Sequence, residues 1–227
     1  FARKIAVSFS ESSKYFNRKD IVVTGNPVRN NIINSDKHLS IKKLGLNPYK
    51  KTLLIVGGSQ GSSSINHAAC EMLPLIRDME LSIIHICGEN NFELVKKNTE
   101  ILEKGQLDYR LFPYSEDIAD IIAASDIALS RAGATILAEL SIRGIPAILV
   151  PYPYASKMHQ DLNAKVFEDA GAAYVIKDDQ LSGKVLANII KSLLEDKNLL
   201  TEMGEKSASI MTKNAAENLL RVIYETI

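Results

Sequence analysis

Cysteine and long apolar runs are scarce in this sequence, and each absence excludes a class of protein. The two cysteines, Cys70 and Cys87, lie in a helical pattern and at the end of an apolar run, which favours buried reduced thiols over a secreted disulfide or a zinc site. No apolar run reaches the ~18 residues of a membrane-spanning helix, and no signal peptide opens the chain. The first residue is Phe rather than Met, and we interpret the chain as a fragment of a longer protein.

An excess of charge is also missing. The 27 basic and 27 acidic residues cancel, so no overall field attracts nucleic acid or an anionic membrane, and we expect no nucleic-acid partner. The sequence has no Asp-x-Asp, the carboxylate pair from which a metal-bound nucleotide-sugar site could be built. We therefore expect no metal and no cofactor. A bound diphosphate would be neutralised by backbone amides, a helix dipole and a local arginine.

From Thr52 onward, short apolar strands alternate with helices, and three amphipathic helices end the chain. This pattern predicts an α/β fold with a Rossmann-like, doubly wound parallel sheet that helices cover on both faces. Ligands of such sheets bind at the carboxyl ends of the strands. The predicted strands are 53–56, 82–87, 109–112, 126–129, 146–150 and 173–176, with helices near 62–77, 91–103, 116–124, 135–143 and 158–170 between them.

Before Thr52 the pattern is less regular. Residues 4–9 and 20–24 are short β-branched runs separated by a polar segment. The polar stretch that follows Arg29 and runs through Lys51 is interpreted as a linker with one short helix at 40–44.

Residues 128–140 contain the end of a strand, a turn with Arg131 and Gly133, and a helix expected to begin near Ala134. The first amides of a helix are unpaired and its dipole favours negative charge, so this stretch predicts a phosphate site. Glu139 follows among apolar neighbours, where an unpaired carboxylate is costly to bury. It could accept both hydroxyls of a ribose. The alternative is a solvated residue, or an ion pair with Arg143 four positions later.

Two other loops carry polar or glycine residues. Gly57, Gly58 and Gly61 resemble a phosphate-binding loop but match neither G-x-G-x-x-G nor a Walker motif, so a ligand loop and a plain tight turn both stay open. His159 and Gln160 follow a proline-rich loop and begin a helix. Their side chains could hold sugar hydroxyls, and helix capping is the alternative.

Together these motifs resemble the MurG family, the bacterial N-acetylglucosaminyltransferases that convert lipid I to lipid II in peptidoglycan synthesis. Their order and spacing over residues 25–173 carry the resemblance. The matching motifs are GNPVR at 25–29, GGSQGS at 57–62, SRAGA at 130–134, Glu139, PAILVPYP at 146–153 and HQDLNA at 159–164.

The resemblance implies the C-terminal half of a two-domain GT-B enzyme. Residues 1–24 would be the tail of a missing N-terminal acceptor domain and a linker, with 4–9 as a strand left without its partners. Residues 25–210 would form the UDP-GlcNAc-binding domain, and 211–227 a helix that packs back on the N-terminal domain. No catalytic residue is expected in this chain. The resemblance therefore implies a fragment that binds the donor weakly without turning it over.

The resemblance also implies ten donor-binding residues. Ser115 departs from the family, in which an aromatic residue is commonly followed by isoleucine, and some relatives have paired glutamines in place of His159 and Gln160. The implied roles are Glu139 for the ribose, Ala134, Thr135 and Ile136 for the diphosphate, the Ser115 backbone and Arg131 for the uracil, Arg29 and Ser59 for the phosphate and sugar side, and His159 and Gln160 for the GlcNAc hydroxyls.

The implied reaction is an inverting displacement in which the 4-hydroxyl of the lipid-linked muramic acid attacks UDP-GlcNAc and UDP leaves. Lipid I and the membrane would be reached only through the missing domain. The full protein would then be peripheral at the cytoplasmic face of the bacterial cell membrane, and the fragment soluble. Two alternatives stay open: a GlcNAc transferase subunit that depends on a partner, and a noncatalytic UDP-sugar-binding module.

Overall fold

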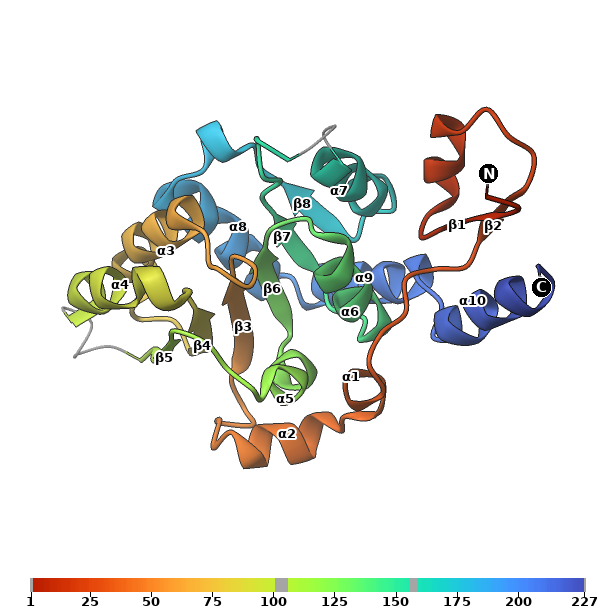
Figure 1. Ribbon diagram of the computed structural model, residues 1–227. Coiled ribbons are helices and arrows are strands. Elements are labelled where there is room, and N and C mark those ends of the chain that lie inside the picture. Colours follow the sequence, from red (N-terminus) through yellow and green to blue (C-terminus); the bar gives the residue numbers. More distant parts are fainter. Residues whose placement is uncertain (1, 101–105, 156–158, 227) are drawn as a thin grey trace.

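A six-stranded parallel sheet forms the centre of the protein (Figure 1). The computed structural model describes residues 2–100, 106–155 and 159–226. Every neighbouring pair of strands in the sheet is parallel, which confirms the predicted α/β fold. In spatial order the strands are β5 (Asp108–Phe112), β4 (Leu81–Ile86), β3 (Lys51–Val56), β6 (Ile127–Ser130), β7 (Ala147–Leu149) and β8 (Ala173–Val175).

Helices cover both faces of this sheet. On β3, Leu54 and Val56 join the hydrophobic cluster on one face, and Leu53 and Ile55 join the cluster on the other. This alternation is what a strand buried on both faces requires, and it explains the unbroken apolar runs in the sequence. The first face packs against α5 (Ile118–Ala124), α6 (Ala134–Ile142) and α7 (His159–Asp169), and the second against α3 (Ser63–Ile76), α8 (Gly183–Glu195) and α9 (Lys197–Ile210).

The predicted helices and strands after Thr52 agree with the structure to within a few residues. The helix predicted at 91–103 is α4 (Phe92–Thr99), preceded by the short 3-10 helix η2 (Glu89–Asn91), and 101–105 lie outside the described residues. Residue 158, the predicted first residue of α7, lies outside them as well. Both cysteines are free thiols; Cys87 is buried as expected, whereas Cys70 is only partly buried. No helix among the described residues has both the length and the apolar character needed to cross a bilayer.

The interpretation of the segment before Lys51 as a linker with one helix at 40–44 was wrong. Two helices form there, α1 (Asn30–Asn34) and α2 (Lys37–Lys43). Asp36 caps α2 by accepting a hydrogen bond from the Leu39 amide, which starts the helix earlier than predicted. α2 packs along α5, where Ser40 Oγ donates to Asp120 at 2.8 Å. The polar residues of this segment therefore attach it to the domain.

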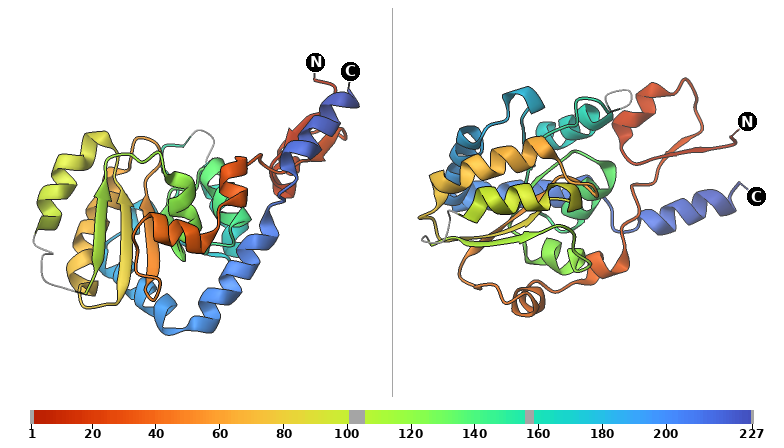
Figure 2. Two further views of the ribbon diagram at one scale, coloured as in Figure 1. Left: turned by 90° about the horizontal axis from the view of Figure 1, so that it is seen from below. Right: turned by 60° about the vertical axis from the view of Figure 1, so that its left-hand side comes forward.

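The strand predicted at 4–9 has a partner, which corrects the expectation that it would lie alone. β1 (Ile5–Val7) pairs in parallel with β2 (Ile21–Val23), and the 3-10 helix η1 (Ser10–Tyr15) connects them. This pair forms a separate sheet beside the C-terminal helix α10 (Ala215–Tyr224), away from the six-stranded sheet (Figure 2).

Candidate functional site

The carboxyl ends of the parallel strands lie at one edge of the sheet, so the loops after β3, β4, β6 and β7 meet there. The loops after β3 and β4 interlock. A Cβ added to Gly61 would lie 1.9 Å from the Cys87 carbonyl oxygen, and one added to Gly88 would lie 2.3 Å from that of Gln60. Close packing between the two loops thus explains why glycine is required at positions 61 and 88, and no ligand is needed to explain it. By contrast, a Cβ added to Gly58 would meet no atom within 4 Å, and Ser59 beside it is exposed.

The turn between β6 and α6 presents the start of a helix at the same edge. Gly133 is the N-cap of α6 and provides no side-chain cap, while Ala134, Thr135 and Ile136 form the partly exposed first turn. The turn is held from two sides. Asn26 donates to the Ala134 carbonyl oxygen, and Asn163 donates to that of Ala132, both at 3.1 Å. This fixed helix end can receive an anion as the sequence predicts.

Glu139 lies in α6 beyond this turn and is almost fully buried, with 5% of its surface exposed. Arg29, which is 110 residues away in the sequence, donates to Glu139 Oε1 at 3.1 Å. Burial raises the pKa of the Glu139 carboxyl, and the hydrogen bond from Arg29 opposes this effect. The structure therefore excludes the solvated alternative, and it pairs Glu139 with Arg29 rather than with Arg143, whose guanidinium donates to the Ile33 carbonyl oxygen.

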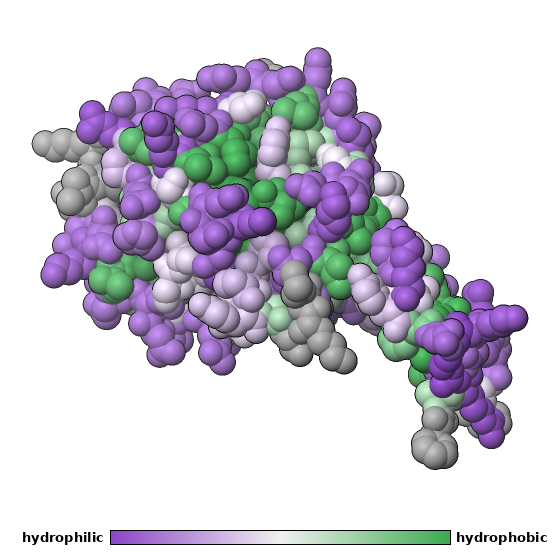
Figure 3. All heavy atoms as spheres, turned by 90° about the horizontal axis from the view of Figure 1, so that it is seen from above, coloured by the Kyte–Doolittle hydropathy of each residue, from purple (hydrophilic) through white to green (hydrophobic). Residues whose placement is uncertain are grey.

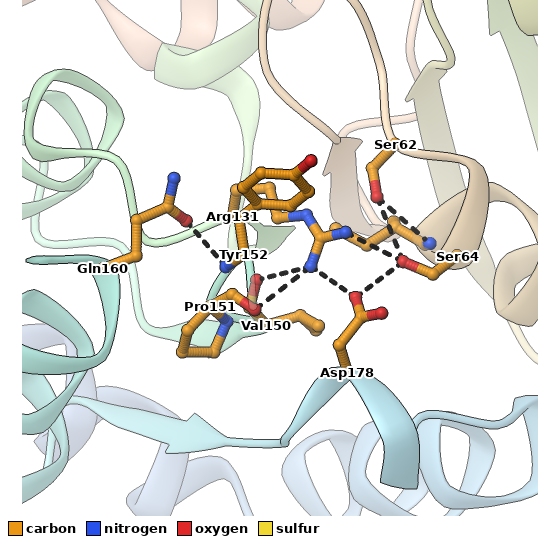
Figure 4. Close-up of polar contacts among 9 residues, drawn as sticks. Ser62, Ser64, Arg131, Val150, Pro151, Tyr152, Gln160 and Asp178 are labelled. Carbon is orange, nitrogen blue, oxygen red and sulfur yellow. Dashed lines mark hydrogen bonds and ion pairs between the residues drawn. The ribbon is translucent and has the colours of Figure 1, made fainter. Parts of the chain in front are cut away.

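The Arg131 side chain is 11% exposed, and its guanidinium is surrounded by protein acceptors (Figure 4). It also lies over the Tyr152 ring, 5.3 Å from the ring centroid. Its other partners come from three separate segments. They are Asp178 Oδ1 at 2.5 Å, Ser64 Oγ at 2.9 Å, and the carbonyl oxygens of Val150 at 3.1 Å and Pro151 at 3.2 Å.

The remaining predicted residues are His159 and Gln160 in the first turn of α7 and Ser115 in the segment after β5. Gln160 Oε1 accepts a hydrogen bond from the Tyr152 amide at 3.0 Å, so one end of this side chain holds the loop after β7. His159, at the described start of α7, lines a groove of about 1030 Å³ with Ala134 and residues of η1. Ser115 Oγ accepts from the Asp117 amide before α5, and no hydrogen bond among the described residues joins Ser115 to Arg131.

Sequence reasoning missed Ser64 and Asp178. They are 114 residues apart and belong to no motif, so only the fold reveals that both contact Arg131. Across residues 2–100, 106–155 and 159–226, no group of three or more His, Cys, Asp or Glu side chains is placed to hold an ion.

A parallel α/β sheet with a helix N-terminus, a buried carboxylate and an arginine at its carboxyl edge defines a Rossmann-like domain of the kind found in GT-B glycosyltransferases. The chain belongs to the glycosyltransferase family 28 C-terminal domain family, which matches residues 52–219. This match confirms the resemblance on which the sequence-based expectations rest.

Curated relatives and a solved structure are similar over nearly the whole chain. A protein of Halothermothrix orenii named UDP-N-acetylglucosamine--N-acetylmuramyl-(pentapeptide) pyrophosphoryl-undecaprenol N-acetylglucosamine transferase is 37% identical over 100% of this chain and 63% of its own length. A Bacillus subtilis protein of the same name is 33% identical over 99% of this chain and 62% of its own. The crystal structure of Acinetobacter baumannii MurG superimposes with a TM-score of 0.78 and 28% identity, over 99% of this chain and 61% of that one. The chain thus spans just over three fifths of these relatives.

Proposed function

We propose that this chain is the donor-binding domain of an inverting glycosyltransferase that moves GlcNAc from UDP-GlcNAc to the 4-hydroxyl of MurNAc in undecaprenyl-pyrophosphoryl-MurNAc-pentapeptide. The observation that carries the proposal is the similarity of the whole chain to relatives named for this transfer. The arrangement at the sheet edge supports it, because a helix N-terminus and a buried carboxylate there suit a nucleoside diphosphate.

The donor would lie along the carboxyl edge of the sheet. Its diphosphate would meet the first-turn amides of α6, at Ala134, Thr135 and Ile136, and its ribose diol would be bound by Glu139. The pairing of Glu139 with Arg29 supports this placement, because it brings a cation within one side-chain length of the ribose site. The other proposed contacts are the Ser115 backbone at the uracil edge, Arg29 and Ser59 on the phosphate and sugar side, and His159 and Gln160 at the GlcNAc hydroxyls. Arg131 would line the uracil pocket without donating to the base, because its terminal nitrogens already donate to protein acceptors.

In the reaction, negative charge develops on UDP as the glycosidic bond breaks. Helix-terminal amides and Arg29 would stabilise that charge, and their fixed geometry is what makes such stabilisation effective. We assign no general base to this chain. The base, lipid I binding and membrane contact would belong to an N-terminal acceptor domain of the full-length protein, peripheral at the cytoplasmic face of the bacterial cell membrane.

Titration of the chain with UDP, UDP-GlcNAc and ADP, followed by calorimetry, tests the proposal. We expect UDP and UDP-GlcNAc to bind and ADP to bind at least about tenfold more weakly, since the base edge is read by backbone groups. Equal affinity for UDP and ADP would contradict the uracil assignment, and no binding of UDP would overturn the donor site itself. Transfer of GlcNAc to lipid I by the isolated chain would show that a base is present after all.

Glu139→Gln provides the matched variant, because it retains the shape of the side chain and removes the charged acceptor. We expect the affinity for UDP to fall by about tenfold or more, the loss of a charge-assisted pair of hydrogen bonds. Glu168→Gln is the control, on an exposed carboxylate of α7 that pairs with Lys165.

A further inference from the structure

Arg131 connects three segments that form walls of the candidate site (Figure 4). Its guanidinium contacts Ser64 at the start of α3, the Val150 and Pro151 carbonyl oxygens after β7, and Asp178 in the 3-10 helix η5 (Asp178–Gln180) after β8. Asp178 is the charged member that neutralises this arginine. A guanidinium offers several donors in one rigid plane, so it can hold all three segments at the same time.

The hydrogen bonds of this cluster fit one consistent direction. Ser64 Oγ donates to Asp178 Oδ1 at 2.7 Å and accepts from Arg131, so its proton is already used. Its contact with Ser62 Oγ at 3.3 Å is then donated by Ser62, and Ser62 Oγ in turn accepts from the Ile65 amide at the start of α3. Each hydroxyl has its partners, and the chain of donors ends on the Asp178 carboxylate.

The glycine loop before α3 and the segment after β7 depend on this cluster to different degrees. The glycine loop before α3 is also fixed by its interlock with the loop after β4, at Gly61 and Gly88. The segment after β7 leaves the sheet at Val150, whose amide donates to the Ser130 carbonyl oxygen. Beyond that point, the described contacts that tie it to the rest of the site are those of Arg131 and the hydrogen bond from the Tyr152 amide to Gln160.

We propose that Asp178 is a positioning residue for the sugar half of the donor: it fixes Arg131, which holds the 150–152 segment and thereby orients Gln160. This inference rests on the proposed function, because it takes Gln160 as a ligand of the GlcNAc hydroxyls. Asp178 itself touches no substrate. Removing its charge leaves Arg131 without its anionic partner and weakens its hold on the Val150 and Pro151 carbonyl oxygens, whereas the glycine loop on the phosphate side keeps its interlock with the loop after β4.

Calorimetric titration of the 227-residue chain with UDP and with UDP-GlcNAc tests this role. Asp178→Asn retains the shape of the side chain and removes its charge. We expect the dissociation constant for UDP-GlcNAc to rise by about tenfold and that for UDP to change by less than about threefold, since one charge-assisted anchor of the sugar side is lost. Asp179→Asn, at the exposed neighbouring aspartate, is the matched control and should change neither constant.

The ratio of the two constants separates positioning from a general loss of structure, which would weaken both ligands alike. Ser64→Ala removes a neutral member of the cluster. It should change the ratio of the UDP-GlcNAc and UDP dissociation constants in the same direction by a smaller factor, and it provides the test if Asp178→Asn does not fold. Equal changes for UDP and UDP-GlcNAc, or no change in either, would overturn the inference. If the wild-type chain does not bind UDP, the proposed function itself is contradicted.

Discussion

Glu139 is a carboxylate almost without access to water, and its partner is Arg29, with 58% of the arginine side chain exposed. A buried carboxylate needs such a partner, because desolvation disfavours its charged form. If a ribose hydroxyl takes the position from which Arg29 donates to Oε1, it replaces Arg29 there. The arginine would then be released toward the phosphate side, where the proposed function needs a cation.

This exchange predicts opposite effects of Arg29→Ala on two ligands. Uridine, which has no phosphate, should bind a few-fold tighter because no arginine competes for Glu139. UDP should bind about tenfold more weakly because a charge-assisted contact to phosphate is lost. Both proteins are titrated at about pH 8, above the ordinary carboxyl pKa, because burial raises the pKa of Glu139. Arg18→Ala, at an arginine paired with Asp20 before β2, is the control, and parallel changes for uridine and UDP would rule out the exchange.

His85 is a second buried titratable group, and it has a structural role. It is fully buried in β4, where Nδ1 contacts the Tyr109 hydroxyl and Nε2 contacts Asn66 Oδ1, each at 2.9 Å. Burial lowers the pKa of His85 to about 3. The folded protein thus holds a neutral imidazole at pH values where the unfolded chain, with a histidine pKa near about 6.5, binds a proton.

The sign of the pH effect follows from this difference. Below about pH 6.5 the unfolded state gains a proton that the folded state does not, so stability falls as the pH falls, by up to about 1.4 kcal/mol per pH unit. Urea unfolding of the wild type and His85→Gln between about pH 7 and about pH 5, a range that spans the unfolded-state pKa, measures it. The wild type should lose more stability on acidification than the variant. Substitution of the exposed His38 by Gln should leave the wild-type pH dependence intact.

At the level of elements, the interlocked loops after β3 and β4 make Gly61 indispensable. Its φ of +77° is one that side chains rarely adopt, and an added Cβ would collide with backbone that cannot move away. Gly61→Ala should therefore destabilise the fold by more than the ~1 kcal/mol typical of a positive φ alone, about 2–4 kcal/mol. Gly45→Ala is matched, because Gly45 also has a positive φ but open space around it. Equal costs for the two substitutions in urea unfolding would contradict the interlock.

The elements also show what local sequence could predict. The strands after Thr52 were predictable because their aliphatic runs are buried on both faces, and the end of α6 because Gly144 follows its last turn. α2 was misplaced because its start depends on one Asp36 cap within a polar segment. In the site, the phosphate position at the start of α6 and the ribose role of Glu139 were predicted from local sequence and agree with the family resemblance. The Arg29–Glu139 and Arg131–Asp178 pairs depend on contacts between distant parts of the chain.

At the scale of the whole molecule, the two ends of the chain form a structure of their own. Asn218 of α10 donates to the Thr24 carbonyl oxygen at 3.3 Å, and Lys4 pairs with Glu225 at 2.6 Å. Apolar side chains that include Val23, Leu220 and Ile223 are about half exposed there, and Figure 3 shows apolar surface among charged groups along this projecting part, at its lower right. The segments predicted as 1–24 and 211–227 are thus neighbours.

A two-stranded parallel sheet is too small to be stable alone, so β1 and β2 should depend on α10. Deleting residues 215–227 should therefore speed amide hydrogen exchange in β1 and β2 by at least about tenfold, while the exchange of β3 and the affinity for UDP stay unchanged. Leu220→Glu, at a half-exposed position of α10, tests whether the apolar surface of the helix also stabilises β1 and β2. A deletion that speeds exchange in β3 as much as in β1 would show instead that the two ends and the six-stranded sheet unfold as one cooperative unit.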